Sequence, residues 1–249
     1  LEADCTIPSE YILLMHFLGD INLKLENKIQ KYLLSKQNKD GGWPLFYDGN
    51  SDISASVKTY FALKLSGINM EKTSMIKTKQ FILKNGGAEN VNVFTRITLA
   101  LFGQISWDSI PYMPIEIMKF PKWFPFNIYK ISYWSRTVLI PLLIIMNKKP
   151  LANNPNNISI DELFKDSKKQ PNVKSVEGSR ITSNLFLVLD KLARFFFPKL
   201  ISNNFKNKCI DSAYQWIIKR LNGKDGLGGI FPAMVNALIA LNIDEKRRY

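Results

Sequence analysis

The sequence has very little of the side-chain chemistry on which metal sites and thiol enzymes depend. It contains one histidine, His16, and two cysteines, Cys5 and Cys209, which stand near opposite ends of the 249-residue chain. Zinc sites draw several Cys and His ligands from short spacings, and a thiol nucleophile needs a basic partner. The sequence therefore predicts no metal site and argues against metal hydrolases and Cys/His enzymes. We expect both cysteines to be free thiols.

Long apolar runs are also absent. The longest, Val138 to Met146, has nine residues and contains Pro141, whereas a helix that spans a bilayer needs about 20. The chain starts at Leu1, and the acidic residues that follow do not resemble a signal peptide. We expect no membrane-spanning helix.

Acidic residues are few, with 21 Asp and Glu against 34 Lys and Arg, which gives a formal net charge of +13. Such a charge suggests an anionic partner: nucleic acid, an acidic lipid surface or an acidic protein. The chain is also rich in Asn, Lys and Ile, so compositional drift explains the charge equally well. Nucleic-acid binding would rest on charge alone, and we expect no nucleic-acid partner.

What the chain does have is 46% hydrophobic residues, enough for a substantial core. Apolar positions recur with helical spacing, and glycines end several of the periodic segments. No window alternates with period 2, so we predict an all-α fold, with caps at Thr6 and at Ser51 or Asp52. The expected helices cover about 6–18, 23–36, 53–66, 74–84, 93–102, 128–146, 183–197, 204–221 and 232–241.

Two segments break this pattern. Four prolines interrupt residues 107–126, which we expect to form an ordered, aromatic-rich connection. Trp123, Phe124 and Phe126 in it are expected to pack in the core. Residues 148–180 are the most polar and least periodic part, and they are expected to form a mobile surface excursion.

The stretch Lys36 to Pro44, KQNKDGGWP, places a tryptophan in a glycine-rich turn. Gly41 and Gly42 permit a sharp turn, Trp43 could pack against a helix end, and the amide of Gln37 could bond to a neighbouring helix terminus. Phosphate-binding glycine patterns are absent, so a structural role is favoured. A looser copy, without the glutamine and tryptophan, spans residues 216–229, which indicates a repeat of helix pairs.

KYLLSKQNKDGGWPL resembles the QW motif of the triterpene cyclases. The stretches GGWPLFYDGNSDISASVKTYFALKLSG, EADCTIPSEYILLMHFLG, TRITLALFGQISWDSIPYMPIEIM, PKWFPFNIYKISYWSRTVLIPL and RLNGKDGLGGIFPAMVNALIAL resemble squalene-hopene cyclases in the same order. The resemblance covers nearly all of the chain except the polar segment.

This resemblance implies an α/α toroid, an α-α barrel of two concentric helix layers, in an enzyme built from two toroids. Such enzymes are isomerases that cyclise squalene to hopene in hopanoid biosynthesis, without a cofactor. The family protonates a terminal alkene with an aspartic acid in a D-x-D-D motif and stabilises the carbocations with aromatic faces. A water-free cavity suits that chemistry, because a stray nucleophile would end the cascade.

The chain contains no D-x-D-D motif; the nearest acidic pair, Asp161-Glu162, does not match. We therefore expect residues 1–249 to form the N-terminal toroid domain, with no catalytic residue, a missing C-terminal cyclase domain and no activity alone. By the resemblance, Trp134 matches a cavity aromatic, although an ordinary buried helix tryptophan remains the alternative. Gln37, Gly41 and Trp43 are expected to be structural.

Residues 184–200, NLFLVLDKLARFFFPKL, combine apolar side chains with Lys191, Arg194 and Lys199. A basic amphipathic helix of this kind is typical of an interfacial membrane anchor. Together with the resemblance, it predicts a peripheral, monotopic protein on the cytoplasmic face of a membrane; a core helix with a basic edge is the alternative. The rival function is a non-catalytic remnant or a lipid-binding helical module.

Overall fold

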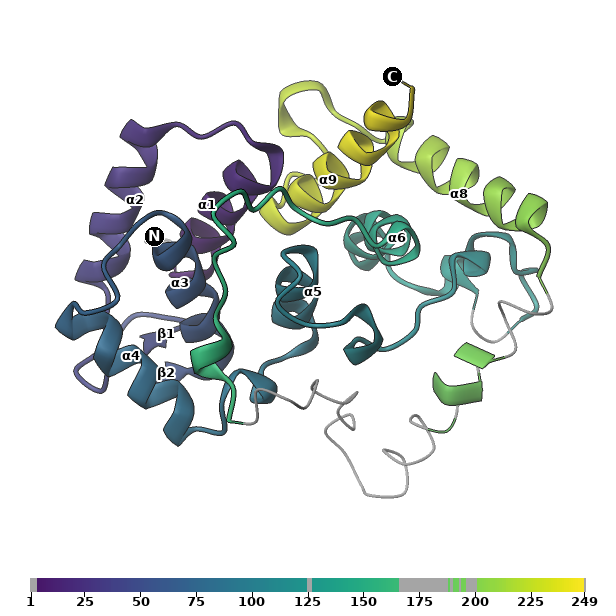
Figure 1. The fold of residues 1–249 in the computed structure, drawn as a ribbon. Coiled ribbons are helices and arrows are strands. Elements are labelled where there is room, and N and C mark those ends of the chain that lie inside the picture. The colour runs from purple at the N-terminus through teal and green to yellow at the C-terminus, as the bar shows by residue number, and fades with distance from the viewer. Residues whose placement is uncertain are drawn as a thin grey trace. The chain divides into compact units, whose positions relative to one another are not determined.

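The computed structural model describes residues 4–124, 127–165, 188, 190–192, 194–195 and 201–248, with side chains up to residue 243. The chain forms two compact units, Leu1–Ile110 with Leu151–Asn172, and Pro111–Pro150 with Val173–Tyr249. Helices dominate the described parts of both (Figure 1). The predicted all-α class, of the toroid type that the resemblance implies, is confirmed.

The first unit is built around one helix that is buried on nearly every side. Its α-helices are α1 (Thr6–Leu18), α2 (Leu23–Ser35), α3 (Ile53–Leu65), α4 (Thr73–Lys84) and α5 (Val93–Leu101). Helix α3 packs against α1, α4 and α5, and 11 of its 13 residues are buried. Small residues such as Ala55 and Ala62 allow neighbouring helices to approach it closely. A helix that is buried all round belongs to the core.

Side-chain caps fix where the helices of this unit begin. Asn22, Asp52 and Asn92 each accept a hydrogen bond from a backbone N–H in the first turn of α2, α3 and α5. The predicted cap at Asp52 is therefore confirmed. The predicted cap at Thr6 is wrong, because Thr6 is the first helical residue and Asp4 accepts bonds from both its N–H and its hydroxyl group.

The connection between α2 and α3 contains the only strands in the described part of the chain. Strand β1 (Trp43–Pro44) pairs antiparallel with β2 (Ser51–Asp52), and Trp43 lies opposite Asp52. This hairpin could not be predicted from the sequence, since two residues per strand are too few to show an alternating pattern. Two 3-10 helices, η1 (Ala88–Asn90) and η2 (Trp107–Ser109), complete this part of the unit.

The first half of the polar segment folds onto the first unit. The N–H of Ala152 donates to the carbonyl of Leu101 at 2.7 Å, and the Gln104 side chain bonds to the backbone of Ile158 and Ile160. The 3-10 helix η5 (Asp161–Leu163) follows, and Leu163 in it is fully buried. Residues 166–180 lie outside the described residues, so the excursion expected there stays a prediction.

The second unit has a helix pair at its centre. Its elements are η3 (Ile115–Lys119), η4 (Ile128–Lys130), α6 (Tyr133–Lys148), α8 (Asn203–Ile218), η6 (Gly223–Asp225) and α9 (Phe231–Arg248). Helix α6 packs against α9 and α8, and η3 packs against α8. The helix predicted from residue 128 begins later, because the side chain of Ser132 caps α6 and separates it from η4.

Candidate functional site

The glycine-rich turn after α2 is held to α4 by Gln37. The side-chain nitrogen Nε2 of Gln37 lies 2.9 Å from the carbonyl oxygen of Gly41, 3.0 Å from that of Ser74 and 2.8 Å from the hydroxyl of Thr78. Ser74 and Thr78 belong to the first two turns of α4. The amide group of Gln37 therefore closes the turn by bonding to Gly41 and ties it to α4 by bonding to Ser74 and Thr78.

Trp43 connects the same turn to two other helices. Its side chain is fully buried, and its indole Nε1–H donates to the carbonyl of Leu33 at 2.7 Å, in the last turn of α2. Its backbone N–H donates to the hydroxyl of Ser56 in α3 at 2.9 Å. The indole thus adds a second hydrogen bond to a carbonyl at the helix end, which also accepts the backbone N–H of Lys36 at 3.1 Å.

The glycines of the turn face helix α4 and strand β2. Gly41 has φ +93°, and a Cβ there would lie 2.6 Å from the carbonyl carbon and oxygen of Lys77. A Cβ on Gly42 would lie 2.5 Å from that of Ser51. Protein atoms occupy the space that a phosphate would need beside these glycines, so the geometry is that of a packed turn.

The second copy of the turn repeats the backbone geometry of the first. The N–H of Asn38 donates to the carbonyl of Gly42, and that of Asn222 donates to the carbonyl of Gly226, both at 2.9 Å. Leu227 stands where the first turn has Trp43, and it is also fully buried. The repeat predicted from the sequence is confirmed locally, with a leucine filling the place of the tryptophan.

Trp134 lies in the first turn of α6 and is 59% exposed. Its ring contacts that of Tyr133 edge-on, with centroids 6.0 Å apart, and Tyr133 in turn lies 6.2 Å from Trp216. The guanidinium of Arg136 lies over the rings of Tyr129 and Tyr133, at 5.6 and 6.0 Å. Trp134 is therefore no ordinary buried helix tryptophan, and its assignment to a substrate cavity stays a prediction.

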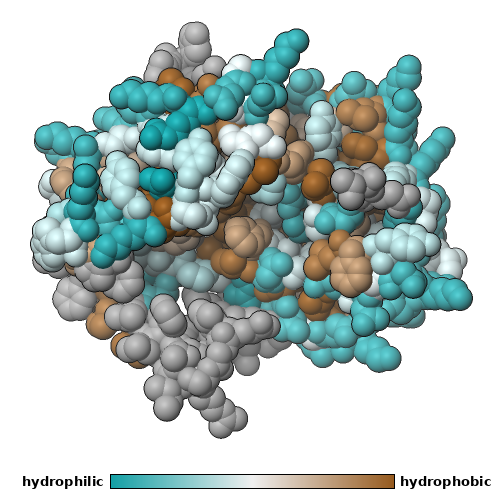
Figure 2. Space-filling model, turned by 180° about the vertical axis from the view of Figure 1, so that it is seen from behind, coloured by the Kyte–Doolittle hydropathy of each residue, from teal (hydrophilic) through white to brown (hydrophobic). Residues whose placement is uncertain are grey.

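Other aromatic residues of the second unit also reach the surface. Trp123, between Pro121 and Pro125, is 78% exposed, which corrects its expected place in the core. The Trp123 ring contacts that of Phe124 edge-on at a centroid distance of 6.0 Å, and Phe124 packs against Phe120 at 4.8 Å. Phe126 lies outside the described residues. Apolar side chains come to the surface at several places on the face in Figure 2.

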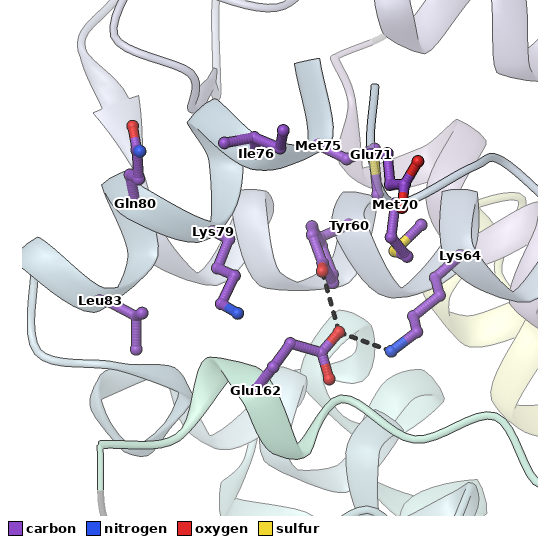
Figure 3. Close-up of a pocket in the computed structure, with 10 residues that line it drawn as sticks. All are labelled: Tyr60, Lys64, Met70, Glu71, Met75, Ile76, Lys79, Gln80, Leu83 and Glu162. Carbon is purple, nitrogen blue, oxygen red and sulfur yellow. Dashed lines mark hydrogen bonds and ion pairs between the residues drawn. The ribbon is translucent and has the colours of Figure 1, made fainter. Parts of the chain in front are cut away.

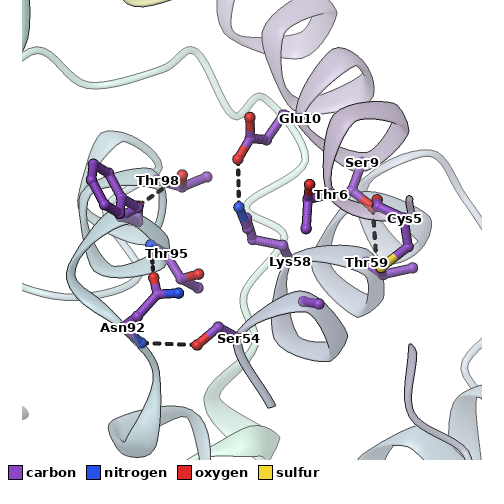
Figure 4. A network of polar contacts seen from close by, with 12 residues as sticks. Cys5, Thr6, Ser9, Glu10, Ser54, Lys58, Thr59, Asn92, Thr95 and Thr98 are labelled. Atoms are coloured by element: carbon purple, nitrogen blue, oxygen red, sulfur yellow. Dashed lines mark hydrogen bonds and ion pairs between the residues drawn. The ribbon is translucent and has the colours of Figure 1, made fainter. Parts of the chain in front are cut away.

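A buried polar network joins α1, α3 and α5 in the first unit (Figure 4). Lys58, only 6% exposed, forms an ion pair with Glu10, and the hydroxyls of Ser9 and Thr59 are 2.9 Å apart. Burial raises the pKa of the Cys5 thiol to about 11, so it is not a thiolate at neutral pH. Cys5 and Cys209 are both free, as predicted, and both are buried.

Glu162, in the acidic pair of the polar segment, is not a proton donor at neutral pH. Burial raises the pKa of Glu162, but hydrogen bonds from Lys64 and Tyr60 outweigh it and hold that pKa below its usual value of 4.5. Burial and the bond to Glu162 raise the pKa of Tyr60. Glu162 is therefore ionised at neutral pH and forms an ion pair with Lys64.

Within the described ranges, no three His, Cys, Asp or Glu residues gather closely enough to hold a metal ion. The same ranges contain no helix that is both long and apolar enough to cross a membrane. Of the expected amphipathic segment 184–200, the described residues are helical, and Val188, Leu192 and Phe195 are 52%, 47% and 56% exposed. Their spacing places them on one stripe.

Asp190 of that segment faces inward, whereas Lys191 is exposed. Asp190 accepts bonds from the backbone N–H of Tyr112 and from Arg194, and its side chain is only 12% exposed. An exposed apolar stripe is what an interfacial helix presents. The choice between a membrane anchor and a core helix with a solvated basic edge stays a prediction.

The comparisons with known proteins agree with the motifs. The family model of the squalene-hopene cyclase N-terminal domain matches residues 1–247. The chain is 46% identical to a squalene-hopene cyclase of Zymomonas mobilis over 96% of its own length and 36% of that protein. It is 45% identical to one of Bradyrhizobium diazoefficiens, over 98% of this chain and 38% of that protein. It is 34% identical to a squalene-hopene cyclase of Alicyclobacillus acidocaldarius, over 98% of this chain and 38% of that protein.

The chain thus spans 36 to 38% of the length of these relatives. Its helical fold, its QW-type turn and the family match over nearly the whole chain lead to one assignment. The chain belongs to the squalene-hopene cyclase family, in which it corresponds to the N-terminal domain.

Proposed function

We propose that this chain is the N-terminal part of a triterpene cyclase that converts squalene to hopene or a related triterpene. The observation that carries the proposal is the family match over residues 1–247, supported by relatives named as squalene-hopene cyclases. The reaction is an isomerisation through carbocations, and it requires no cofactor.

In this proposal Trp134 supplies an aromatic face to the substrate cavity. Among aromatic side chains an indole ring is the strongest partner for a cation, and it stabilises a carbocation without acting as a nucleophile. Its 59% exposure within the chain leaves the face open to a ligand. Arg136 already lies over two neighbouring tyrosine rings, which illustrates that this cluster accepts positive charge.

The proton that starts the cascade would come from outside this chain. The sequence has no D-x-D-D motif, and Glu162 in the acidic pair is held ionised. A carboxylate that is ionised at neutral pH cannot protonate an alkene. The missing C-terminal cyclase domain would therefore supply the acid, and the chain alone would not initiate cyclisation.

The proposal includes peripheral binding to the cytoplasmic face of a membrane. The exposed stripe of Val188, Leu192 and Phe195, next to the exposed Lys191, suits insertion into the boundary between acyl chains and anionic head groups. Squalene is a hydrocarbon that resides in the bilayer, so an enzyme that lies on the membrane has direct access to it.

The QW-type residues Gln37, Gly41 and Trp43 would act as a clamp rather than as chemical groups. The contacts of Gln37 with α4, and those of Trp43 with α2 and α3, support this role. Such a clamp would hold the helices together while an exothermic cyclisation proceeds.

Complementation tests the proposal. The chain would be incubated with squalene-loaded liposomes, alone or with the part of the Zymomonas mobilis relative that it does not span, and extracted triterpenes would be analysed by mass spectrometry. We expect no product from the chain alone and hopene from the pair. Trp134→Ala should lower the yield and Trp134→Phe should restore part of it, with Trp123→Ala as the matched exposed control.

Hopene from the chain alone would refute the need for a second domain. If folded halves associate but give no product, the rival function is favoured, namely a non-catalytic remnant or a lipid-binding helical module.

A further inference from the structure

A pocket of about 550 Å³ lies in the first unit, and none of the QW-type residues Gln37, Gly41 and Trp43 lines it. It is formed by α3, the Met70–Glu71 turn, α4 and η5 (Figure 3). All four elements belong to the same compact unit. Its size is in the range of small-molecule sites.

The polar groups on the η5 side of the pocket are already paired. Glu162 accepts hydrogen bonds from the hydroxyl of Tyr60 at 2.9 Å and from the ammonium of Lys64, which also donates to the carbonyl of Ser159 at 2.6 Å. The charges of Lys64 and Glu162 therefore neutralise each other. These two residues leave no net charge for a ligand.

Lys79 supplies the remaining charge inside the pocket. Figure 3 shows its side chain extending from α4 into the space above Glu162, without an ion pair or hydrogen bond to the residues drawn. Its side chain is half-buried, and in the described part of the chain its ammonium has no bonding partner. The carboxylate of Glu71 stands at the exposed rim. A half-buried ammonium without a partner favours an anionic group, which would form a charge-assisted hydrogen bond with it.

The rest of the wall is apolar. Met70 and Leu83 are half-exposed, Ile76 is 43% exposed, and Met75 lies fully buried behind them. Methionine side chains are flexible and polarisable, so they adapt to ligands of different shape. A hydrocarbon chain on this wall would remove exposed apolar surface from water.

We propose that this pocket binds a single-chain amphiphile of the fatty-acid class, with its carboxylate on Lys79 and its hydrocarbon chain against Met70 and Ile76. The cation and the adjoining apolar wall match the two parts of such a molecule. A cationic amphiphile would meet the ammonium groups of Lys79 and Lys64, and an alcohol would lack the charge that Lys79 attracts. The site is separate from the proposed squalene chemistry and does not depend on it.

Methionine methyl NMR on the whole chain tests this proposal, because only two of the seven methionines line the pocket. The chain would be labelled with ¹³C-methyl methionine and titrated with dodecanoate, octanoate, dodecylammonium and dodecanol, each below its aggregation concentration. We expect dodecanoate to shift the Met70 signal and leave those of Met15, Met118 and Met234 in place. Octanoate should bind more weakly, because it buries less apolar surface.

Charge is tested with a matched pair of variants on α4. Lys79→Gln should weaken dodecanoate binding about fivefold, the upper range for a partly exposed ion pair, and leave dodecanol binding unchanged. Lys77→Gln removes an exposed charge of the same helix that does not line the pocket, and it should have no effect.

Equal binding of dodecanoate and dodecylammonium would overturn the proposal, as would an equal response of the two lysine variants. Shifts at all methionines would indicate detergent-like unfolding and would also count against a specific site. If Lys79→Gln alters the unliganded spectrum, the chain-length and head-group series on the unmodified chain still decides the question.

Discussion

The indole nitrogen of Trp43 lies 2.7 Å from the carbonyl oxygen of Leu33, and both side chains are fully buried. This single contact links the end of α2 to the hairpin that leads into α3. The ring of Trp43 is buried among apolar atoms, and its N–H is hydrogen-bonded. A tryptophan suits this turn because it combines a large apolar surface with one hydrogen-bond donor.

Replacing Trp43 by Phe should lower the free energy of unfolding by about 1–3 kcal/mol, because a buried hydrogen bond is lost and the smaller ring leaves a void. Urea denaturation of the whole chain measures this. Trp123→Phe is the matched control, since Trp123 is 78% exposed, and its effect should stay within about 0.5 kcal/mol. Equal effects of the two variants would contradict the clamp.

Replacing Gln37 by Glu should lower the free energy of unfolding by about 3 kcal/mol, because a carboxylate would face the carbonyl oxygens of Gly41 and Ser74 in place of a donor. Thermal unfolding followed by circular dichroism gives the readout. Gln215→Glu, on the exposed side of α8, makes the same chemical change at a site without these acceptors. A stable Gln37→Glu variant would show that the amide bonds contribute little.

Gly41→Ala and Gly19→Ala form a second matched pair. Both glycines have positive φ, +93° and +77°, but only at Gly41 would a Cβ meet backbone atoms, 2.6 Å away in Lys77. We expect the Gly41 variant to be destabilised by about 2–4 kcal/mol more than the Gly19 variant, as an overpacked site. If their unfolding midpoints fall together, the close approach of α4 is not important for stability.

The ion pair of Lys58 and Glu10 gives a prediction for a double-mutant cycle. Lys58→Met should cost about 3 kcal/mol, because it leaves Glu10 without its partner next to the core. Adding Glu10→Leu should restore much of the loss, since neither charge then needs pairing. The four free energies of unfolding give the coupling, and additive losses would argue against a direct interaction.

Glu162 predicts loss of stability in acid. Its pKa is lowered in the folded chain, so the folded state binds its proton less tightly than the unfolded state does. The resulting stabilisation is present above pH 4.5 and declines as the pH falls through the folded-state pKa. Glu162→Gln should flatten the pH dependence of the free energy of unfolding between neutral pH and about pH 3. Glu71→Gln, at an exposed carboxylate of the same pocket, is the control. An unchanged slope for Glu162→Gln would refute the assignment.

Much of the fold could be predicted because helices leave a local signature. The periodic apolar residues and the cap at Asp52 located α3, and the expected helix 74–84 differs from α4 by one residue. Thr6 and residue 128 show the limit of local signals. The side chain of Asp4 caps the start of α1, and that of Ser132 caps the start of α6. Other hydroxyl and carboxylate residues nearby could have made the same bonds, so the sequence alone did not identify the capping residue.

The candidate sites also differ in whether the sequence could reveal them. The motif around Gln37 and Trp43 was found from the sequence, because its turn residues are contiguous. The pocket at Lys79 was not found, because Glu162 lies more than eighty residues from it along the chain and no local pattern joins them. The buried pair of Lys58 and Glu10 was missed for the same reason.

The sequence by itself determined the family, the all-α class and the lack of a D-x-D-D acid, because these depend on residue types at short spacings. Only the tertiary structure decided that Trp123 and Trp134 are exposed while Trp43 is buried, and that the stripe at Val188, Leu192 and Phe195 faces outward. An aromatic or aliphatic side chain has the same hydrophobicity in every position, and its burial depends on which distant elements pack against it.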